Sequence, residues 1–148
     1  MEIEDKIVVI TGGTKGLGKA LASCFLKNGA KVIVCSRDEK VALAQMRKQD
    51  FGLIINILST SALDGKINET AYCSSKFAAM GFTKSLKKEV DGQKIKVYAV
   101  YPGGMRTNLF DEKKPENYTD FMDPNDVASR IVENLKKEIS EEELIIKR

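Results

Sequence analysis

The sequence contains no histidine. Catalytic sites of the Ser-His-Asp or Cys-His kind, and metal sites with imidazole ligands, are therefore excluded. Any acid or base that works near neutral pH must be a tyrosine, lysine, cysteine, aspartate or glutamate. The acid–base chemistry open to this chain is accordingly narrow.

Cysteine is scarce, with Cys24, Cys35 and Cys73 and no CxxC spacing. An odd number without paired spacing argues against a disulfide framework and against a zinc site, and suits a reducing compartment. We therefore expect no bound metal and no disulfide.

Long apolar runs and an excess of one charge are missing as well. No stretch approaches the roughly 20 apolar residues that cross a bilayer. The first residues, MEIEDKIVVI, are acidic where a signal peptide is basic. The net charge of +3 is small and dispersed, which argues against a nucleic-acid partner. We expect a cytoplasmic protein that binds neither membranes nor nucleic acid.

The pattern of apolar residues predicts one α/β domain over residues 1–148, a length that suits a single domain. Apolar runs rich in valine and isoleucine predict buried parallel strands at 6–11, 31–36, 53–59, 96–102 and 143–148. Helices are predicted between them at 16–28, 38–50, 71–90 and 124–139. Gly29 ends the first helix, and Asp123-Pro124 begins the last one. This alternation predicts a three-layer, Rossmann-like parallel sheet with helices on both faces.

A glycine-rich turn, in ITGGTKGLGKAL, links the first strand to the first helix. Gly12, Gly16 and Gly18 allow a tight turn, close approach of the backbone to a pyrophosphate, and close packing of the helix on the sheet. The helix N-terminus offers N–H groups to the anion. We predict a dinucleotide site here because the turn lies in a βαβ unit of the expected length; the alternative is a purely structural turn.

The second strand ends in VCSRDE, at the position where a carboxylate would bind the adenosine ribose of NAD. Ser36 and Arg37 stand there instead, and Lys15 lies in the glycine turn. Two cations and a hydroxyl suit the 2′-phosphate of NADP. The alternative, two exposed basic residues, stays open because Asp38 and Glu39 follow directly.

Tyr72 and Lys76 lie four positions apart in AYCSSKFAAM, which places both side chains on one face of a helix. Such a pair is usually solvated, so its spacing alone predicts little. Here it belongs to an ordered set of motifs: the glycine turn, Ser59 at a strand end, Tyr72-x-x-x-Lys76, and PGGMRT after the next strand. In these motifs and their order the chain resembles the short-chain dehydrogenase/reductase family.

The resemblance implies an oxidoreductase that moves a hydride between NADP(H), as NADPH in the reducing direction, and a small-molecule carbonyl or secondary alcohol. Tyr72 would be the general acid or base, Lys76 would favour its phenolate and bind the nicotinamide ribose, and Ser59 would hold the substrate oxygen. Residues 103–123 would be a substrate lid, or equally a plain surface connection. The cofactor-binding residues that the resemblance implies are Thr11, Gly12, Thr14, Lys15, Gly16, Leu17, Gly18, Ser36, Arg37, Tyr72, Lys76, Pro102, Gly103 and Thr107.

The chain departs from the family between its second strand and the stretch VALAQMRKQDFGLIINILS. The family normally has two further strands there, one ending in Asn-Asn-Ala-Gly, and a long helix with a catalytic asparagine. Closing the sheet without them gives the flavodoxin-like strand order 2-1-3-4-5. The shortening leaves an alternative open, a nucleotide-binding or interaction module with little or no catalysis.

The predicted helix at 71–90 carries the apolar residues Phe77, Met80, Phe82 and Leu86. They spread too widely around the helix for a single core-facing stripe. We therefore expect this helix to form the subunit contact of a homo-oligomer.

Overall fold

The computed structural model describes residues 2–35, 39–111 and 114–148. Strands and helices alternate along the chain and the strands pair in parallel, which confirms the predicted α/β class. The residues form two compact units. Unit 1 comprises residues 1–37, 104–140 and 148, and unit 2 comprises residues 38–103 and 141–147. That the whole chain acts as one domain stays a prediction.

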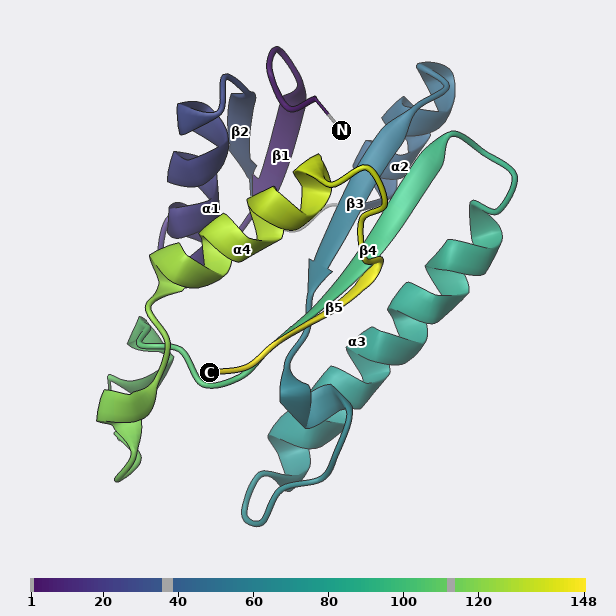
Figure 1. Cartoon of the computed structure of the whole chain (residues 1–148). Helices are drawn as coiled ribbons and strands as arrows, with labels where there is room; N and C mark the ends of the chain where they lie inside the picture. The colour runs from purple at the N-terminus through teal and green to yellow at the C-terminus, as the bar shows by residue number, and fades with distance from the viewer. Residues whose placement is uncertain (1, 36–38, 112–113) are drawn as a thin grey trace. The chain divides into compact units, whose positions relative to one another are not determined.

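Unit 1 is built on a two-stranded parallel sheet of β1 (Ile7–Thr11) and β2 (Lys31–Cys35). Helix α1 (Gly16–Lys27) packs on both strands, and helix α4 (Pro124–Lys136) packs along α1 (Figure 1). The apolar sides of the two helices are buried, as their spacing requires. The buried residues of these helices include Leu17, Leu21, Phe25, Val127, Ile131 and Val132.

The ends of these helices follow local sequence signals. Gly29, directly after the Asn28 cap of α1, has φ +80°, a left-handed conformation that suits glycine. Asp123 accepts a hydrogen bond from the N–H of Asn125 at 2.8 Å, and Pro124 occupies the first helical position of α4. The predicted end of the first helix and the predicted start of the last one are both confirmed.

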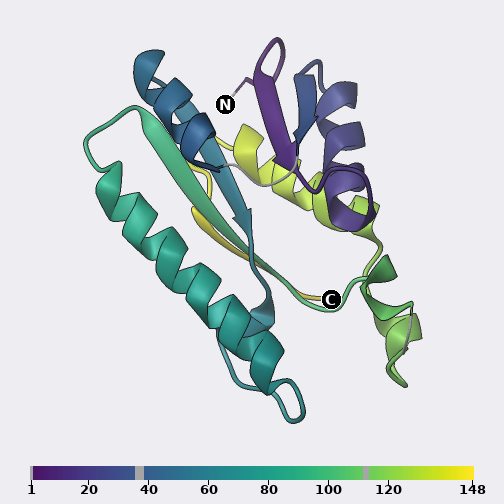
Figure 2. The same ribbon diagram turned by 180° about the vertical axis from the view of Figure 1, so that it is seen from behind.

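Unit 2 contains a three-stranded parallel sheet in the order β3-β4-β5. Its strands are β3 (Gly52–Ile57), β4 (Ile95–Pro102) and β5 (Glu143–Ile146). Helices α2 (Glu39–Lys48) and α3 (Thr70–Glu89) lie over β3 and β4, as the view in Figure 2 shows. Every residue of β4 except Lys96 is buried, so β4 is the centre of this unit.

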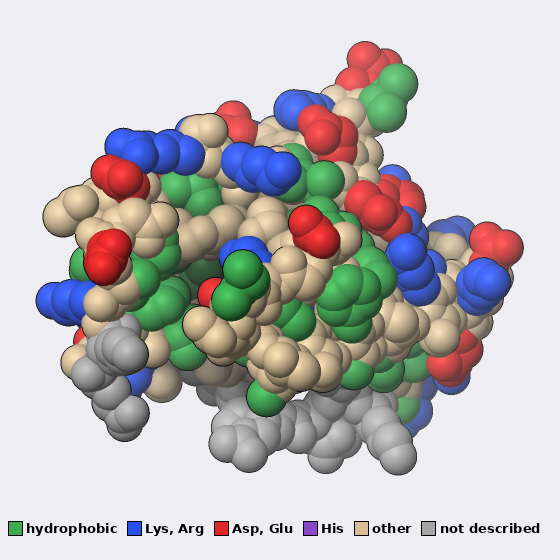
Figure 3. Space-filling view, turned by 90° about the horizontal axis from the view of Figure 1, so that it is seen from below, with side chains coloured by type: hydrophobic (Ala, Val, Ile, Leu, Met, Phe, Trp, Pro, Cys, Tyr) green, Lys and Arg blue, Asp and Glu red, His purple; other side chains and the backbone are tan. Residues whose placement is uncertain are grey.

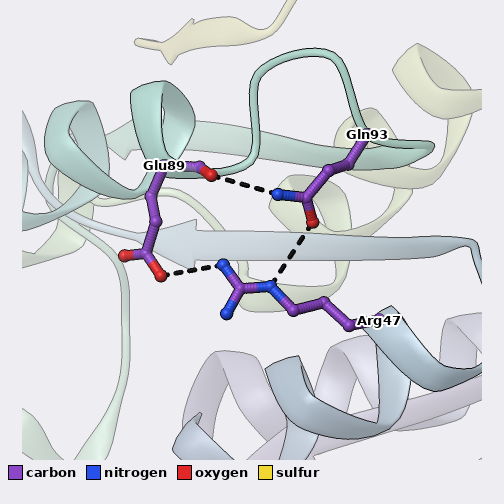
Figure 4. A network of polar contacts seen from close by, with 3 residues as sticks. All are labelled: Arg47, Glu89 and Gln93. Carbon is purple, nitrogen blue, oxygen red and sulfur yellow. Dashed lines mark hydrogen bonds and ion pairs between the residues drawn. The ribbon is translucent and has the colours of Figure 1, made fainter.

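Helix α2 is held in unit 2 by apolar packing and by a polar network. Met46 packs against the cluster that includes Leu86 of α3. Arg47 forms an ion pair with Glu89 at 2.9 Å and donates a longer hydrogen bond, 3.4 Å, to the side-chain oxygen of Gln93. The side-chain nitrogen of Gln93 in turn donates to the carbonyl of Glu89 at 3.1 Å (Figure 4). The three side chains tie the end of α2 to the end of α3.

The strand order is confirmed only within each sheet. The neighbours 2-1 and 3-4-5 are as predicted, but among the described strands no hydrogen-bonded pairing joins β1 to β3. The predicted continuous order 2-1-3-4-5 is therefore not confirmed.

Acidic and basic side chains are interspersed with hydrophobic ones on the face drawn in Figure 3, in keeping with the small net charge. In the described parts of the chain no helix is both long and apolar enough to cross a membrane. Over the same residues, no group of three or more histidine, cysteine, aspartate or glutamate side chains lies close enough to hold a metal ion.

Candidate nucleotide-binding and catalytic sites

The glycine turn of unit 1 needs glycine for different physical reasons at its three positions. Gly12 and Gly16 have φ +68° and +51°, in the left-handed region that other residues rarely adopt. Gly18 is restricted by space instead, because a Cβ atom there would lie 2.3 Å from the carbonyl oxygen of Gly12. The backbone therefore folds into a tight turn directly before α1.

No acidic residue of the first turn of α1 neutralises the positive end of the helix dipole. The cap residue of α1 is Lys15, and within the described residues no side chain accepts a capping hydrogen bond there and no acidic residue lies in the first turn. Thr11, Thr14 and Lys15 are exposed, whereas Leu17 is buried in the core. Such an end, with its N–H groups and positive dipole, suits an anionic group. The predicted residues Ser36 and Arg37 lie outside the described residues.

Thr107 is brought to the glycine turn by the tertiary structure. Its Cβ and Cγ2 atoms lie 3.4 Å from the position that a Cβ of Gly16 would take. Thr107 also caps the short helix η2 (Asn108–Phe110), because its hydroxyl accepts a hydrogen bond from the N–H of Leu109 at 3.4 Å. Two predicted cofactor-binding positions, far apart in sequence, thus meet within unit 1.

Ser59 lies in unit 2, directly before the short helix η1 (Thr60–Ala62), and is 7% exposed. Its Oγ accepts a hydrogen bond from the N–H of Ser61 at 3.1 Å. Because the hydroxyl is used there as an acceptor, its own proton remains available for donation to another oxygen. This arrangement suits a group that hydrogen-bonds a substrate carbonyl.

Tyr72 and Lys76 share one face of α3, as their spacing predicts. The Nζ atom of Lys76 lies 5.7 Å from the centre of the Tyr72 ring. Tyr72 keeps 36% of its surface exposed, so its phenol can be reached from solvent. Burial lowers the pKa of Lys76 from its ordinary value. A cation within about 6 Å of an aromatic ring is attracted to its face, so this pair is not two independent solvated side chains.

Pro102 and Gly103 lie at the end of β4. Pro102 is buried and stands opposite Ile146 of β5, and the N–H of Gly103 donates to the carbonyl of Ile146 at 2.9 Å. The predicted site residues thus fall into two groups. Unit 1 holds the glycine turn and Thr107, and unit 2 holds Ser59, Tyr72, Lys76, Pro102 and Gly103.

The sequence pattern did not point to Ser61 or Glu69, which connect the two ends of the segment between Ser59 and Tyr72. The hydroxyl of Ser61 donates to the carboxylate of Glu69 at 3.4 Å, and Glu69 directly precedes α3. An acidic residue before an apolar helix is a recognised helix-start signal and could have indicated Glu69. Nothing in the sequence indicated its partner.

Unit 1 also has an open pocket of about 280 Å³ at the base of the segment after β4. Arg106 pairs with Asp123 at 3.6 Å, and Arg148 pairs with Asp120 at 3.3 Å. The hydrogen bond from the backbone N–H of Asn125 lowers the pKa of Asp123, and Arg106 adds to this effect. The charges of the arginines and aspartates that line this pocket balance, so the pocket favours neither an anionic nor a cationic ligand. Its lining is Arg106, Thr119, Asp120, Phe121, Met122, Asp123, Asp126, Arg130 and Arg148.

Comparison with known families gives a match to the model of the family described as short chain dehydrogenase, over residues 6–44 and 39–118. The two matches overlap only at 39–44 and together cover more than half of the chain. The family pattern therefore runs through the chain in two pieces that meet after β2, where the sequence predicts the shortening.

Among similar proteins, carbonyl reductase family member 4 of Xenopus laevis is 36% identical over 99 residues, which are 63% of this chain and 42% of that protein. A 3-oxoacyl-(acyl-carrier-protein) reductase of Haemophilus influenzae is 43% identical over 79 residues, which are 51% of this chain and 33% of that protein. The chain thus spans less than half of the length of these curated relatives.

Solved structures with the same fold include a short chain dehydrogenase of Burkholderia cenocepacia in complex with NADP. It has a TM-score of 0.81 and 19% identity, over 100% of this chain and 90% of that one. A 3-ketoacyl-(acyl-carrier-protein) reductase of Brucella melitensis complexed with NADH has a TM-score of 0.78 and 19% identity, over 97% of both chains. At this identity the likeness concerns the fold.

Proposed function

The chain belongs to the short chain dehydrogenase family, and on this premise we propose that it transfers a hydride between NADP(H) and a carbonyl or secondary alcohol. The observation that carries the proposal is the pairing of Tyr72 with Lys76 on one face of α3, in the same unit as a Ser59 hydroxyl that can donate. The glycine turn and the N-terminus of α1 support the binding of a dinucleotide pyrophosphate.

In the reducing direction, NADPH held at this site would supply a hydride for the carbonyl carbon. Tyr72 gives its phenolic proton to the carbonyl oxygen, and Ser59 donates a hydrogen bond to the same oxygen. Lys76, in its protonated form, stabilises the phenolate that remains on Tyr72. In the oxidising direction, the Tyr72 phenolate removes the proton from the alcohol oxygen. The product gains one C–H and one O–H bond, while the carbonyl π bond, the phenolic O–H bond of Tyr72 and the C–H bond that carries the hydride are broken. The two electrons come with the hydride.

Lys15, Ser36 and Arg37 would hold the 2′-phosphate, which makes NADP(H) the preferred dinucleotide. The glycine turn would hold the pyrophosphate, and Pro102, Gly103 and Thr107 would contact the nicotinamide. The preference can be measured by titration with NADPH and NADH, following nicotinamide fluorescence. We expect tighter binding of NADPH, and Arg37→Asp should shift the preference toward NADH. Equal or tighter binding of NADH by the unchanged protein would refute the NADP assignment.

The acid–base role is tested by Tyr72→Phe, which keeps the aromatic ring and removes the proton donor. The variant should lower kcat for reduction of a panel of aldehydes and ketones by about 10²–10⁴. Its thermal midpoint should change little, because the ring of Tyr72 is retained. Phe51→Leu, in the same unit but outside α3 and 55% exposed, is the matched control and should leave kcat unchanged. Retention of full reductase activity by Tyr72→Phe would remove Tyr72 from the mechanism.

The second candidate is a nucleotide-binding or interaction module with little catalysis. It is favoured by the shortening after β2, because the resemblance implies two further strands and a long helix with a catalytic asparagine that this chain does not have there. NADPH binding without turnover across the carbonyl panel would support this second candidate, and turnover that depends on Tyr72 would exclude it.

Assembly through α3 is part of the proposal. Phe77 and Phe82 are 41% and 50% exposed on this helix, whereas Met80 and Leu86 pack into the interior of unit 2. Two exposed phenylalanines on one helix favour a contact with a second copy. Light scattering at high protein concentration tests this, because a monomer there would contradict a homo-oligomer formed through α3.

A further inference from the structure

In unit 1, backbone hydrogen bonds join the two ends of the segment that follows β4. The N–H of Met122 donates to the carbonyl of Gly104 at 3.0 Å, and the N–H of Arg106 donates to the carbonyl of Met122 at 3.0 Å. Met105 and Met122 form an isolated bridge between the same two stretches. Its two ends are thus joined through the backbone, so contacts made inside the segment can determine its conformation.

Three aromatic rings pack against each other inside this segment, and we name them the aromatic triad: Phe110, Tyr118 and Phe121. Their centres lie 5.2–5.8 Å apart and their planes are inclined by 53–67°. Tilted and edge-to-face contacts at such distances are favourable beyond the area that they bury. Lys114 covers the Tyr118 ring, with its Nζ 5.1 Å from the ring centre.

Gly104 leaves the space that Phe121 fills. A Cβ atom at position 104 would lie 2.7 Å from two carbons of the Phe121 ring and 2.8 Å from a third. These distances are far below ordinary contact, so any side chain at 104 would displace the ring. The absence of a side chain at Gly104 therefore leaves room for the Phe121 ring in its observed position.

The triad is connected to the glycine turn through η2. Phe110 is the last residue of η2, and its N–H donates to the carbonyl of Thr107 at 3.3 Å. Thr107 also accepts a hydrogen bond from the N–H of Leu109 and packs on Gly16. The contacts thus run without interruption from Phe121 through Phe110 and Thr107 to the turn that precedes α1.

We propose that the aromatic triad is a positioning device that holds Thr107 against Gly16, so that packing of the triad and binding of a dinucleotide at the glycine turn favour each other. The coupling rests on the proposed function. Such coupling is reciprocal. If packing of the triad strengthens dinucleotide binding by a certain factor, a bound dinucleotide should favour the packed triad by the same factor. A triad that is only a local core would leave dinucleotide binding unaffected.

The first experiment needs no ligand and follows amide hydrogen exchange at Leu109 and Phe110. Phe121→Ala removes one ring, and Gly104→Ala keeps every ring but displaces Phe121; both should accelerate exchange at these two amides. Tyr118→Phe preserves the triad and should not. Phe51→Ala, which truncates an exposed phenylalanine directly before β3, is the matched control outside unit 1. Unchanged exchange in both triad variants would overturn the positioning role.

The second experiment measures NADPH affinity by fluorescence and repeats the exchange measurement with NADPH bound. Phe121→Ala and Gly104→Ala should each raise the Kd about 5-fold or more, as is usual for coupled sites. Tyr118→Phe should keep the original Kd, and NADPH should slow exchange at Leu109 and Phe110 in the unchanged protein. If the unchanged protein binds NADPH but the triad variants bind it equally well, the coupling fails while the proposed function stands. If the unchanged protein binds no dinucleotide, the proposed function fails and the coupling with it.

Discussion

Strands β1 and β4 have similar apolar sequences but differ in burial. In β4, Ile95, Val97 and Val100 are 5%, 3% and 2% exposed, as expected for a strand covered on both faces. In β1, Ile10 is buried, whereas Ile7 and Val9 are 69% and 46% exposed. Ile33 of the neighbouring strand β2 is 53% exposed as well. The sheet of unit 1 thus leaves part of its apolar surface uncovered.

The difference shows what a run of apolar residues can and cannot predict. Such a run predicts a strand, because branched apolar side chains favour extended backbone. Burial requires, in addition, that other segments cover both faces of the sheet. Among the described residues between β2 and β3, the one helix or strand is α2. The apolar pattern therefore cannot tell which of the two strands will be covered on both faces.

The largest expected effect contrasts Ile95→Ala with Ile7→Ala. Ile95 packs in the core of unit 2, so its truncation leaves a cavity and should lower the free energy of unfolding by about 2–5 kcal/mol. Ile7 is mostly exposed, so the same change should cost about 0.5 kcal/mol or less. Urea unfolding measures both values. Equal losses would mean that another surface covers Ile7 in solution, through self-association for example.

Two glycines provide the next contrast, at the glycine turn and on α3. In Gly18→Ala, the added methyl would collide with the Gly12 carbonyl, and we expect a loss of about 1–3 kcal/mol of stability together with weaker NADPH binding. In Gly81→Ala, the methyl meets no atom within 4 Å inside a helix, and we expect a gain of about 0.5–1 kcal/mol. A lower thermal midpoint for Gly18→Ala and a higher one for Gly81→Ala would support this contrast. A neutral Gly18→Ala would contradict the close packing described for the turn.

The partly buried Lys76 of unit 2 makes stability depend on pH. Burial lowers the pKa of Lys76 below its ordinary value of 10.5, so the unfolded state binds more protons between the lowered pKa and pH 10.5. Stability contributed by this residue must rise with pH across that window. Relative to the unchanged protein, Lys76→Met should therefore be most stable below the window and lose this advantage as pH rises through it. A stability difference that does not vary with pH would show that Lys76 titrates as it does in the unfolded chain.

The smallest effect concerns the network of Arg47, Glu89 and Gln93. Its ion pair is about half exposed, so Arg47→Ala should cost only about 0.2–1 kcal/mol, and less at high salt. Lys136→Ala removes an exposed pair with Glu133 within one helix of unit 1 and is the matched control. The free energy of unfolding of both variants is measured by chemical unfolding at low and at high salt. A loss for Arg47→Ala that salt does not reduce would mean that packing of the side chain, rather than its charge, holds α2.

Much of the fold could be predicted because its signals are local. Asp123-Pro124 begins α4, and Gly29 ends α1 with a positive φ, as the residue types require. Tyr72 and Lys76 meet because helical geometry brings residues four positions apart together. The meeting of Thr107 with Gly16, and that of Ser61 with Glu69, could not be predicted. These contacts join segments whose approach depends on the folding of the whole unit.

The sequence by itself determined the alternation of strands and helices, the glycine turn, and the shared face of the tyrosine and lysine, because backbone preferences and helical periodicity act over a few residues. Only the tertiary structure decided that the strands form two sheets, that β4 is covered while β1 is partly exposed, and that Phe121 fills the space above Gly104. These features depend on which distant segments remain available to pair with an edge, cover a face or fill a space. A local pattern does not show which distant segment will cover a strand.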